Sequence, residues 1–136
     1  MFYKQNQSYE LDEKLFKNPT SEYRAAPFWA WNCKLNKDIL NEQIDIFKKM
    51  GFGGFHMHSR IGMSTPYLKD EFMGLIKFCT QKAEQENMLA YLYDEDRWPS
   101  GSAGGYVTKT HKYRQRYLIF SQNSREHFSL DEAINS

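Results

Sequence analysis

The feature that most constrains the fold of this chain is a regular repeat of strand and helix signals. Short apolar runs begin near positions 26, 53 and 88, and segments of helical spacing separate them. This β-α-β-α-β order predicts parallel strands joined by right-handed crossovers. A spacing of roughly 30 residues is the size of one unit of a TIM-type (β/α)8 barrel. We therefore predict an α/β fold that forms about the first three units of such a barrel.

The strand signals are apolar and aromatic runs at residues 26–32, 53–59 and 88–93. The last run is almost continuously apolar, which predicts a strand that is covered on both faces. A polar loop over residues 60–69 follows the second strand.

Two amphipathic helices are predicted between the strands. Asn36 can cap the first helix, and Gly51 can end it in a left-handed turn. Asn87 can end the second helix. The residues expected on the inner faces are Ile39, Leu40, Ile44, Phe47 and Met50 in the first helix, and Phe72, Leu75, Ile76, Cys79 and Ala83 in the second.

The length of the chain limits how much of a barrel it holds. A complete barrel needs about 250 residues, whereas this sequence has 136. We predict an N-terminal extension over residues 1–25, with a short helix near 11–16, and an incomplete barrel domain over 26–136. Ser129 and Glu132 form a capping-box pattern close to the end of the sequence, which is typical of a helix start. We expect a truncated N-terminal fragment whose missing barrel strands come from the rest of a longer protein.

Charge and composition disfavour several classes of partner. The formal net charge is +1 and no basic stripe stands out, so neither nucleic acid nor an anionic membrane is expected as a partner. No apolar run reaches membrane-spanning length, and the first residues lack a signal-peptide pattern. Cys33 and Cys79 fit no metal or disulfide motif. These features predict a cytoplasmic location.

The first strand ends in aromatic residues. Binding and catalytic groups of parallel barrels gather at the C-terminal ends of the strands. Trp29 and Trp31 share one face of the strand by alternation, and Asn32 lies on the other. A tryptophan can stack on a sugar ring and an asparagine can hydrogen-bond a hydroxyl. The alternative is that both tryptophans belong to the core.

The second strand end carries His56, His58 and Arg60, which alternation places on one face. The imidazoles can hydrogen-bond sugar hydroxyls, and Arg60 can hold a carboxylate. Two histidines two residues apart can also bind one Zn²⁺ ion. Structural packing is the third interpretation.

The third strand end carries the acids Asp94, Glu95 and Asp96, with Trp98 two residues further on. Consecutive acids after a buried strand are costly unless they are solvated, paired or metal-bound. Glycoside cleavage needs two carboxylates, and Glu95 is our only candidate for one of them. The acids can equally bind sugar hydroxyls or Ca²⁺, or form a solvated turn. The small residues of 99–105 do not have the spacing of a phosphate-binding loop.

Three segments together resemble a known group of enzymes. They are residues 26–32 (APFWAWN), 51–60 (GFGGFHMHSR) and 91–101 (YLYDEDRWPSG), and residues 113–118 (YRQRYL) also fit. The combination resembles the start of large bacterial glycosyl hydrolases related to the α-L-rhamnosidases of glycoside hydrolase family 106. The resemblance implies a sugar-binding wall here, with the catalytic carboxylates further along the barrel and β-rich domains after it. The group has a glycine where this chain has Arg97.

The sequence as a whole predicts a fragment of an α-L-rhamnosidase-like enzyme that hydrolyses O-glycosidic bonds. The strand ends supply sugar-binding residues, the partner is a carbohydrate, and the fragment alone is inactive. We expect no metal and no cofactor here, with Ca²⁺ left open for the full-length enzyme. The alternatives are a metal-dependent hydrolase using His56 and His58, and a non-catalytic sugar-binding module or inactive remnant.

Overall fold

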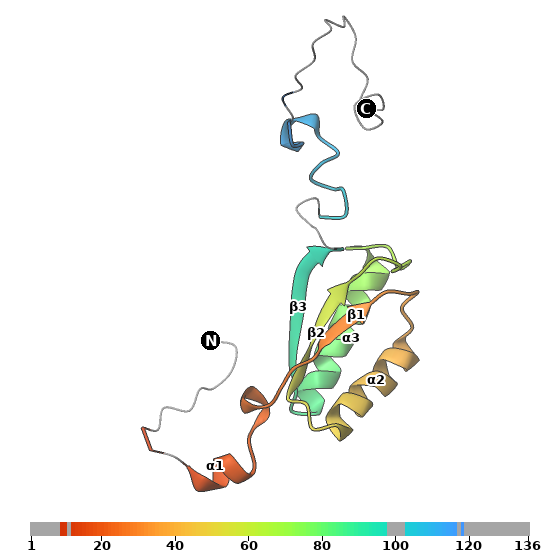
Figure 1. Ribbon diagram of the computed structural model, residues 1–136. Coiled ribbons are helices and arrows are strands. Elements are labelled where there is room, and N and C mark those ends of the chain that lie inside the picture. The colour runs from red at the N-terminus through yellow and green to blue at the C-terminus, as the bar shows by residue number, and fades with distance from the viewer. Residues whose placement is uncertain (1–8, 11, 98–102, 117, 119–136) are drawn as a thin grey trace, which may run out of the picture.

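The computed structural model describes residues 9–10, 12–97, 103–116 and 118. Its centre is a three-stranded sheet of order β1-β2-β3, built from β1 (Phe28–Trp31), β2 (Gly54–Ser59) and β3 (Leu89–Asp96). Both strand pairs are parallel. The helices α2 (Lys37–Lys49) and α3 (Asp70–Gln85) make the two crossovers and lie on one side of the sheet (Figure 1). The predicted α/β class with parallel strands is confirmed, and the arrangement is consistent with a partial TIM-like unit.

The remaining elements are short. They are α1 (Glu13–Lys17) and the 3₁₀ turns η1 (Ser21–Tyr23) and η2 (His111–Tyr113). Asp12 caps α1 by accepting hydrogen bonds from the amides of Lys14 and Leu15, so the short helix predicted near 11–16 is present. No helix in the described part of the chain has the length and apolar character that crossing a membrane requires. The Ser129–Glu132 pattern lies outside the described residues.

The predicted helix boundaries are confirmed. The side chain of Asn36 accepts from the amides of Asp38 and Ile39 at the start of α2. Gly51 follows this helix with φ +84°, the left-handed conformation that glycine adopts at least cost. Asn87 plays the same part after α3 with φ +53°.

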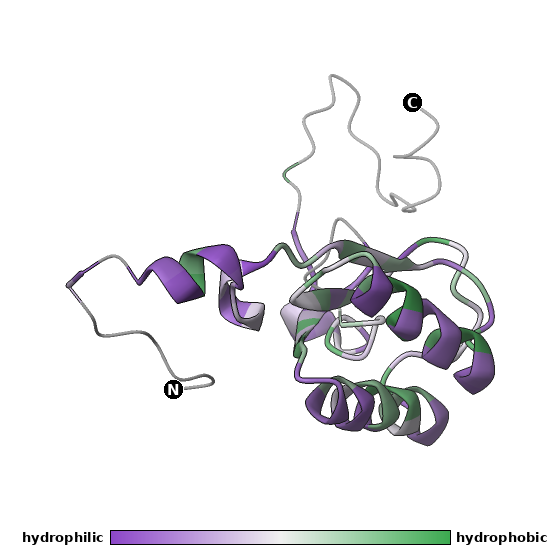
Figure 2. Cartoon of the chain, turned by 90° about the horizontal axis from the view of Figure 1, so that it is seen from below, coloured by the Kyte–Doolittle hydropathy of each residue, from purple (hydrophilic) through white to green (hydrophobic). Residues whose placement is uncertain are grey.

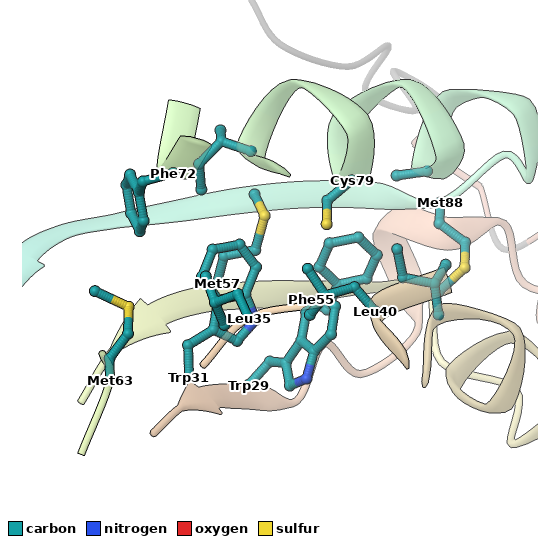
Figure 3. Close-up of a cluster of buried hydrophobic side chains, with 13 residues drawn as sticks. Trp29, Trp31, Leu35, Leu40, Phe55, Met57, Met63, Phe72, Cys79 and Met88 are labelled. Carbon is teal, nitrogen blue, oxygen red and sulfur yellow. The ribbon is translucent and has the colours of Figure 1, made fainter. Parts of the chain in front are cut away.

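The core lies between the sheet and the two helices (Figure 3). Phe55 and Met57 of β2 are fully buried in it. Edge-to-face ring contacts extend the cluster, with centroids 5.1 Å apart for Trp29 and Phe55 and 5.9 Å apart for Trp31 and Phe72. Seen from below, the helices show hydrophobic residues beside hydrophilic ones, as expected for elements with one covered face (Figure 2).

The two helices match their predicted inner faces to different degrees. In α3, the side chains of Phe72, Ile76, Cys79 and Ala83 are buried and Leu75 packs beside them. In α2, Leu40 and Ile44 are buried and Phe47 packs against them. The prediction was wrong for Ile39 and Met50, which are exposed. Ile39 lies about 100° around the helix from Leu40, and Met50 is already the C-cap residue.

The third strand differs from its prediction in two ways. β3 continues to Asp96, so the three acids belong to the strand and not to a turn after it. The strand is also not covered on both faces. Leu92 lies in register with the buried Met57 but is 50% exposed, so the helix side of β3 is only partly covered. The apolar run therefore predicted that both faces of β3 are buried, whereas the described residues bury them only in part.

The N-terminal ends of the strands are closed by the segment before β1. The amide of Gly53 donates to the carbonyl of Ala25 at 2.9 Å. A Cβ atom on Gly53 would lie only 2.0 Å from the carbonyl oxygen of Ser21. The Ser21 hydroxyl in turn donates to the carbonyl of Asn87, just before β3. Main chain therefore packs tightly across this end, and the opposite end carries the candidate site.

Candidate functional site

The C-terminal ends of β2 and β3 are offset by an irregularity in the sheet. Met57 pairs with Leu92, but the next register pair joins Ser59 to Asp96. One residue of β2, His58, therefore lies opposite three residues of β3. Because β3 has two more residues than β2 between these pairs, the acidic end of β3 is out of the register that the start of the strand sets.

The bulge gives the three acids different surroundings. Asp94 is exposed, and its carbonyl accepts the Tyr67 hydroxyl at 3.0 Å. Asp96 lies in register with Ser59 on the helix side, is buried, and forms an ion pair with Arg97 at 2.9 Å. Alternation along β3 places Glu95 on the opposite face of the sheet. The acidic run is therefore not a single cluster of carboxylates.

The face of the sheet opposite the helices carries aromatic and imidazole rings. His58 packs between Phe28 and Tyr93, with ring centroids 4.6 Å and 4.1 Å away. His56 stacks on Tyr91 with centroids 4.5 Å apart and planes 13° from parallel. We call these five residues and Glu95 the open face, because no described helix covers them. Parallel barrels place their interior on this side of the strands.

His58 is the most enclosed member of the open face. It is 2% exposed, and neither ring nitrogen has a hydrogen-bond partner among the described residues. Burial lowers the pKa of His58 and the positive charge of Arg60 lowers it further, while Glu95 acts in the opposite direction. The imidazole is therefore neutral at neutral pH and presents one donor and one acceptor.

Other buried polar atoms near this end also have no hydrogen-bond partner among the described residues. They are Oε2 of Glu95, Oγ of Ser59, Oδ1 of Asp96 and Nε1 of Trp31. Buried polar atoms are nearly always hydrogen-bonded, so each such atom requires an explanation. Glu95 and His58 share the open face, whereas Ser59 and Asp96 lie toward the helices. Only the first pair lies on the side of the sheet opposite the helices.

The tryptophans of β1 do not reach the open face. Trp29 and Trp31 are buried in the helix-side core, and the Trp29 indole donates to Gln43 of α2 at 2.8 Å. Neither ring therefore offers a surface to a sugar, which corrects our expectation and favours the core alternative. Trp98 lies outside the described residues.

Asn32 and Arg60 lie at the rim of the strand ends. Asn32 is exposed, and its carbonyl approaches Gly62 so closely that a Cβ there would be 2.5 Å away. The Arg60 amide donates to the carbonyl of Trp31 at 2.9 Å, which ties the ends of β1 and β2 together. Both residues follow the ends of their strands, and their role in sugar binding stays a prediction.

The metal alternative gains no support from the geometry. Within the described ranges, no three or more His, Cys, Asp or Glu side chains gather closely enough to hold a metal ion. His56 and His58 point to the same face, but each ring packs against its own tyrosine.

Sequence analysis did not identify several residues of this region. The alternation of Tyr91, Tyr93 and Glu95 with the histidines could have identified the open face, because all occupy every second position. No signal identified Tyr67, whose loop position is set by tertiary contacts. Burial raises the pKa of Tyr67, and the charges of Asp96, Asp94 and Glu95 raise it further.

Comparison with solved structures gives a distant likeness. No family model and no curated protein matches this chain. A solved rhamnosidase from Novosphingobium sp. PP1Y resembles it with a TM-score of 0.52 and 23% sequence identity. The likeness covers 63% of this chain but only 9% of that enzyme. It shows that the strand and helix units described above share the fold of the matched part of that enzyme.

Proposed function

We propose that this chain contributes a sugar-binding wall to a glycoside hydrolase barrel of the α-L-rhamnosidase type. Three features support the proposal: the rhamnosidase likeness, the three sequence segments that resemble this group, and the polar groups of the open face. The observation that carries it is that His58 and Glu95 share the open face and that each has buried polar atoms without a hydrogen-bond partner among the described residues.

The donors and acceptors of this pair suit a sugar. A carboxylate only accepts hydrogen bonds, whereas a neutral imidazole offers one donor and one acceptor. A sugar hydroxyl both donates and accepts, so two neighbouring hydroxyls can satisfy Glu95 and His58 together. The rings of Phe28 and Tyr93 beside them supply an apolar surface for the C–H groups of the sugar.

In this proposal Glu95 binds substrate, and the second carboxylate of the reaction comes from elsewhere. Glycosidases use two carboxyl groups that flank the scissile bond, about 5–9.5 Å apart. Asp94 and Asp96 do not share the face of Glu95. The remaining barrel strands of a longer protein supply the missing groups, and this chain alone turns over no glycoside.

Calorimetric titration with L-rhamnose tests the proposal. We expect a weak affinity, roughly millimolar, because few groups contact the sugar. Glu95→Gln and His58→Phe should each remove the binding heat. Glu84→Gln, an exposed glutamate on α3, is the matched control and should leave it unchanged.

Two results would contradict the proposal. One is binding that survives both substitutions, and the other is the lack of any binding by the wild-type chain. Release of a chromophore from an aryl rhamnoside by the purified chain would refute the statement that it is inactive alone.

A further inference from the structure

Arg97 connects three segments at the C-terminal ends of the strands, through its side chain and its main-chain amide. Its Nη1 donates to Oδ2 of Asp96 at 2.9 Å, and its Nη2 donates to the carbonyl of Met63 at 3.1 Å. The Arg97 amide donates to the carbonyl of Ser59 at 3.2 Å. The end of β3, the end of β2 and the loop over residues 60–69 therefore meet at one residue.

The loop over residues 60–69, which Arg97 contacts, lies between the segment after β1 and the end of β3. We call these three segments the rim. On the other side of the loop, the Ser64 amide donates to the carbonyl of Cys33 at 3.4 Å, and the Leu35 amide donates to the Thr65 hydroxyl at 2.9 Å. These bonds join the loop to the segment after β1. Arg97 makes the corresponding connection to β3, with help from the Tyr67 hydroxyl bond to Asp94.

The main chain of Arg97 adopts a conformation that glycine would adopt more easily. Its φ is +60°, in the left-handed region where a Cβ atom is unfavourable. A side chain persists in such a conformation only where its surroundings hold it. The partner carboxylate is well placed to do so, because the Asp96 side chain is only 3% exposed while Arg97 is 42% exposed. Charged hydrogen bonds to a buried group are strong.

We propose that Arg97 is a positioning residue, which fixes the loop 60–69 over the strand ends and, by holding Asp96, keeps Glu95 directed to the open face. The first part stands on the contacts alone, and the second rests on the proposed function. Arg97 touches no sugar in this account. Its effect on binding is transmitted through Asp96 and the loop.

Hydrogen exchange of the rim amides tests the first part. Arg97→Gly removes the side chain while it relieves the backbone, so misfolding is not the expected outcome. We expect the amides of Met63, Ser64 and Leu35 to exchange roughly ten-fold faster or more, the effect of losing bonds from a charged donor. Arg97→Lys should restore part of the protection. Asn87→Gly is the control, since it places glycine at another left-handed position and should not alter these amides.

Binding of L-rhamnose by the same variants tests the second part. Affinity should fall in Arg97→Gly and recover partly in Arg97→Lys. Unchanged rim exchange in Arg97→Gly would overturn the inference, and so would exchange that accelerates equally throughout the sheet. If only the rim amides accelerate but the wild-type chain binds no sugar, the proposed function fails while the positioning of the loop stands. If the rim accelerates and sugar affinity is unchanged, the link from Arg97 to Glu95 is wrong.

Discussion

The two faces of the three-stranded sheet differ in what their side chains pack against. Toward the helices, Phe55, Met57 and the tryptophans fill a continuous apolar core. On the open face, histidines alternate with them along β2 and pack against tyrosines of β3. The first face is filled by apolar packing from the two helices. The second has no described helix over it, and its buried His58 nitrogens and Glu95 Oε2 have no hydrogen-bond partner among the described residues. The apolar packing that stabilises the fold therefore lies on one face, and the groups of the proposed sugar site lie on the other.

Two phenylalanines on neighbouring strands give the largest test of this comparison. Phe55 is 0% exposed on the helix side, whereas Phe28 is 53% exposed on the open face. Phe55→Ala should lower the free energy of unfolding by about 3–5 kcal/mol, because it leaves a cavity in a packed core. Phe28→Ala should cost about 1 kcal/mol or less. Urea unfolding of both variants measures the difference, and equal losses would break the distinction between the faces.

A pair of glycines compares the two ends of the strands. A methyl group on Gly53 would collide with the main chain of Ser21, which cannot move without opening the closed end. On Gly104, with φ +66°, it would meet side-chain atoms of Tyr67 and Asp96 at 3.0 Å and 3.3 Å. Gly104→Ala should cost about 1–2 kcal/mol for the left-handed backbone, and Gly53→Ala should cost more. Thermal unfolding ranks the two, and the reverse order would show that the N-terminal end is not tightly closed.

The pH dependence of stability should reveal the enclosed imidazole of the open face. The pKa of His58 in the folded chain lies below its unfolded value of 6.5, so the unfolded chain binds the proton more readily. His58 therefore contributes stability above pH 6.5 that is lost as the pH falls through the lowered pKa of the folded state. The unfolding midpoint should drop between pH 7 and pH 5.

A substitution identifies the group responsible for this drop. His58→Phe should flatten the pH dependence, whereas His111→Phe, at an exposed position, should leave it unchanged. A profile that His58→Phe does not alter would show that His58 is not enclosed as described.

The smallest expected effect is a difference in thiol reactivity between the two cysteines, with no change in the stability of the fold. Cys79 is buried in the core, and burial raises the pKa of its thiol to about 12. Cys33 is exposed after β1. A thiol reagent at pH 8 should label Cys33 and spare Cys79 in the folded chain, with both labelled in denaturant. Mass spectrometry of peptides detects the sites, and early labelling of Cys79 would mean that the covered face opens readily.

Local signals in the sequence predicted most of the elements, because these signals act over a few residues. Asn36, Gly51 and Asn87 cap or end helices through their own backbone preferences and side chains. The faces were harder to predict. Whether Trp29 and Trp31 bind sugar or fill the core depends on which side the helices cover, and alternation alone does not specify that side.

The acidic residues 94–96 are a second case in which the sequence did not specify the surroundings of each side chain. Three adjacent carboxylates look alike in the sequence, yet the bulge opposite His58 separates their environments. Alternation puts Glu95 on one face and its neighbours on the other once the strand is known to reach Asp96, but the burial of Asp96 beside Ser59 depends on pairing between distant segments. The glycine expected at position 97 did carry information, since Arg97 still adopts the left-handed conformation that a glycine favours. The expected glycine therefore matches the backbone conformation found at this position.

The central claim is that the open face, and not the helix side, binds sugar through His58 and Glu95. The most direct measurement is an NMR titration with L-rhamnose that follows the imidazole signals of His58 and the methyl signal of Met57, its neighbour on the opposite face of β2. We expect the His58 signals to shift to saturation while Met57 stays unchanged, and we expect Glu95→Gln to abolish the shift. Shifts at Met57 without shifts at His58, or no shift at either, would contradict the claim.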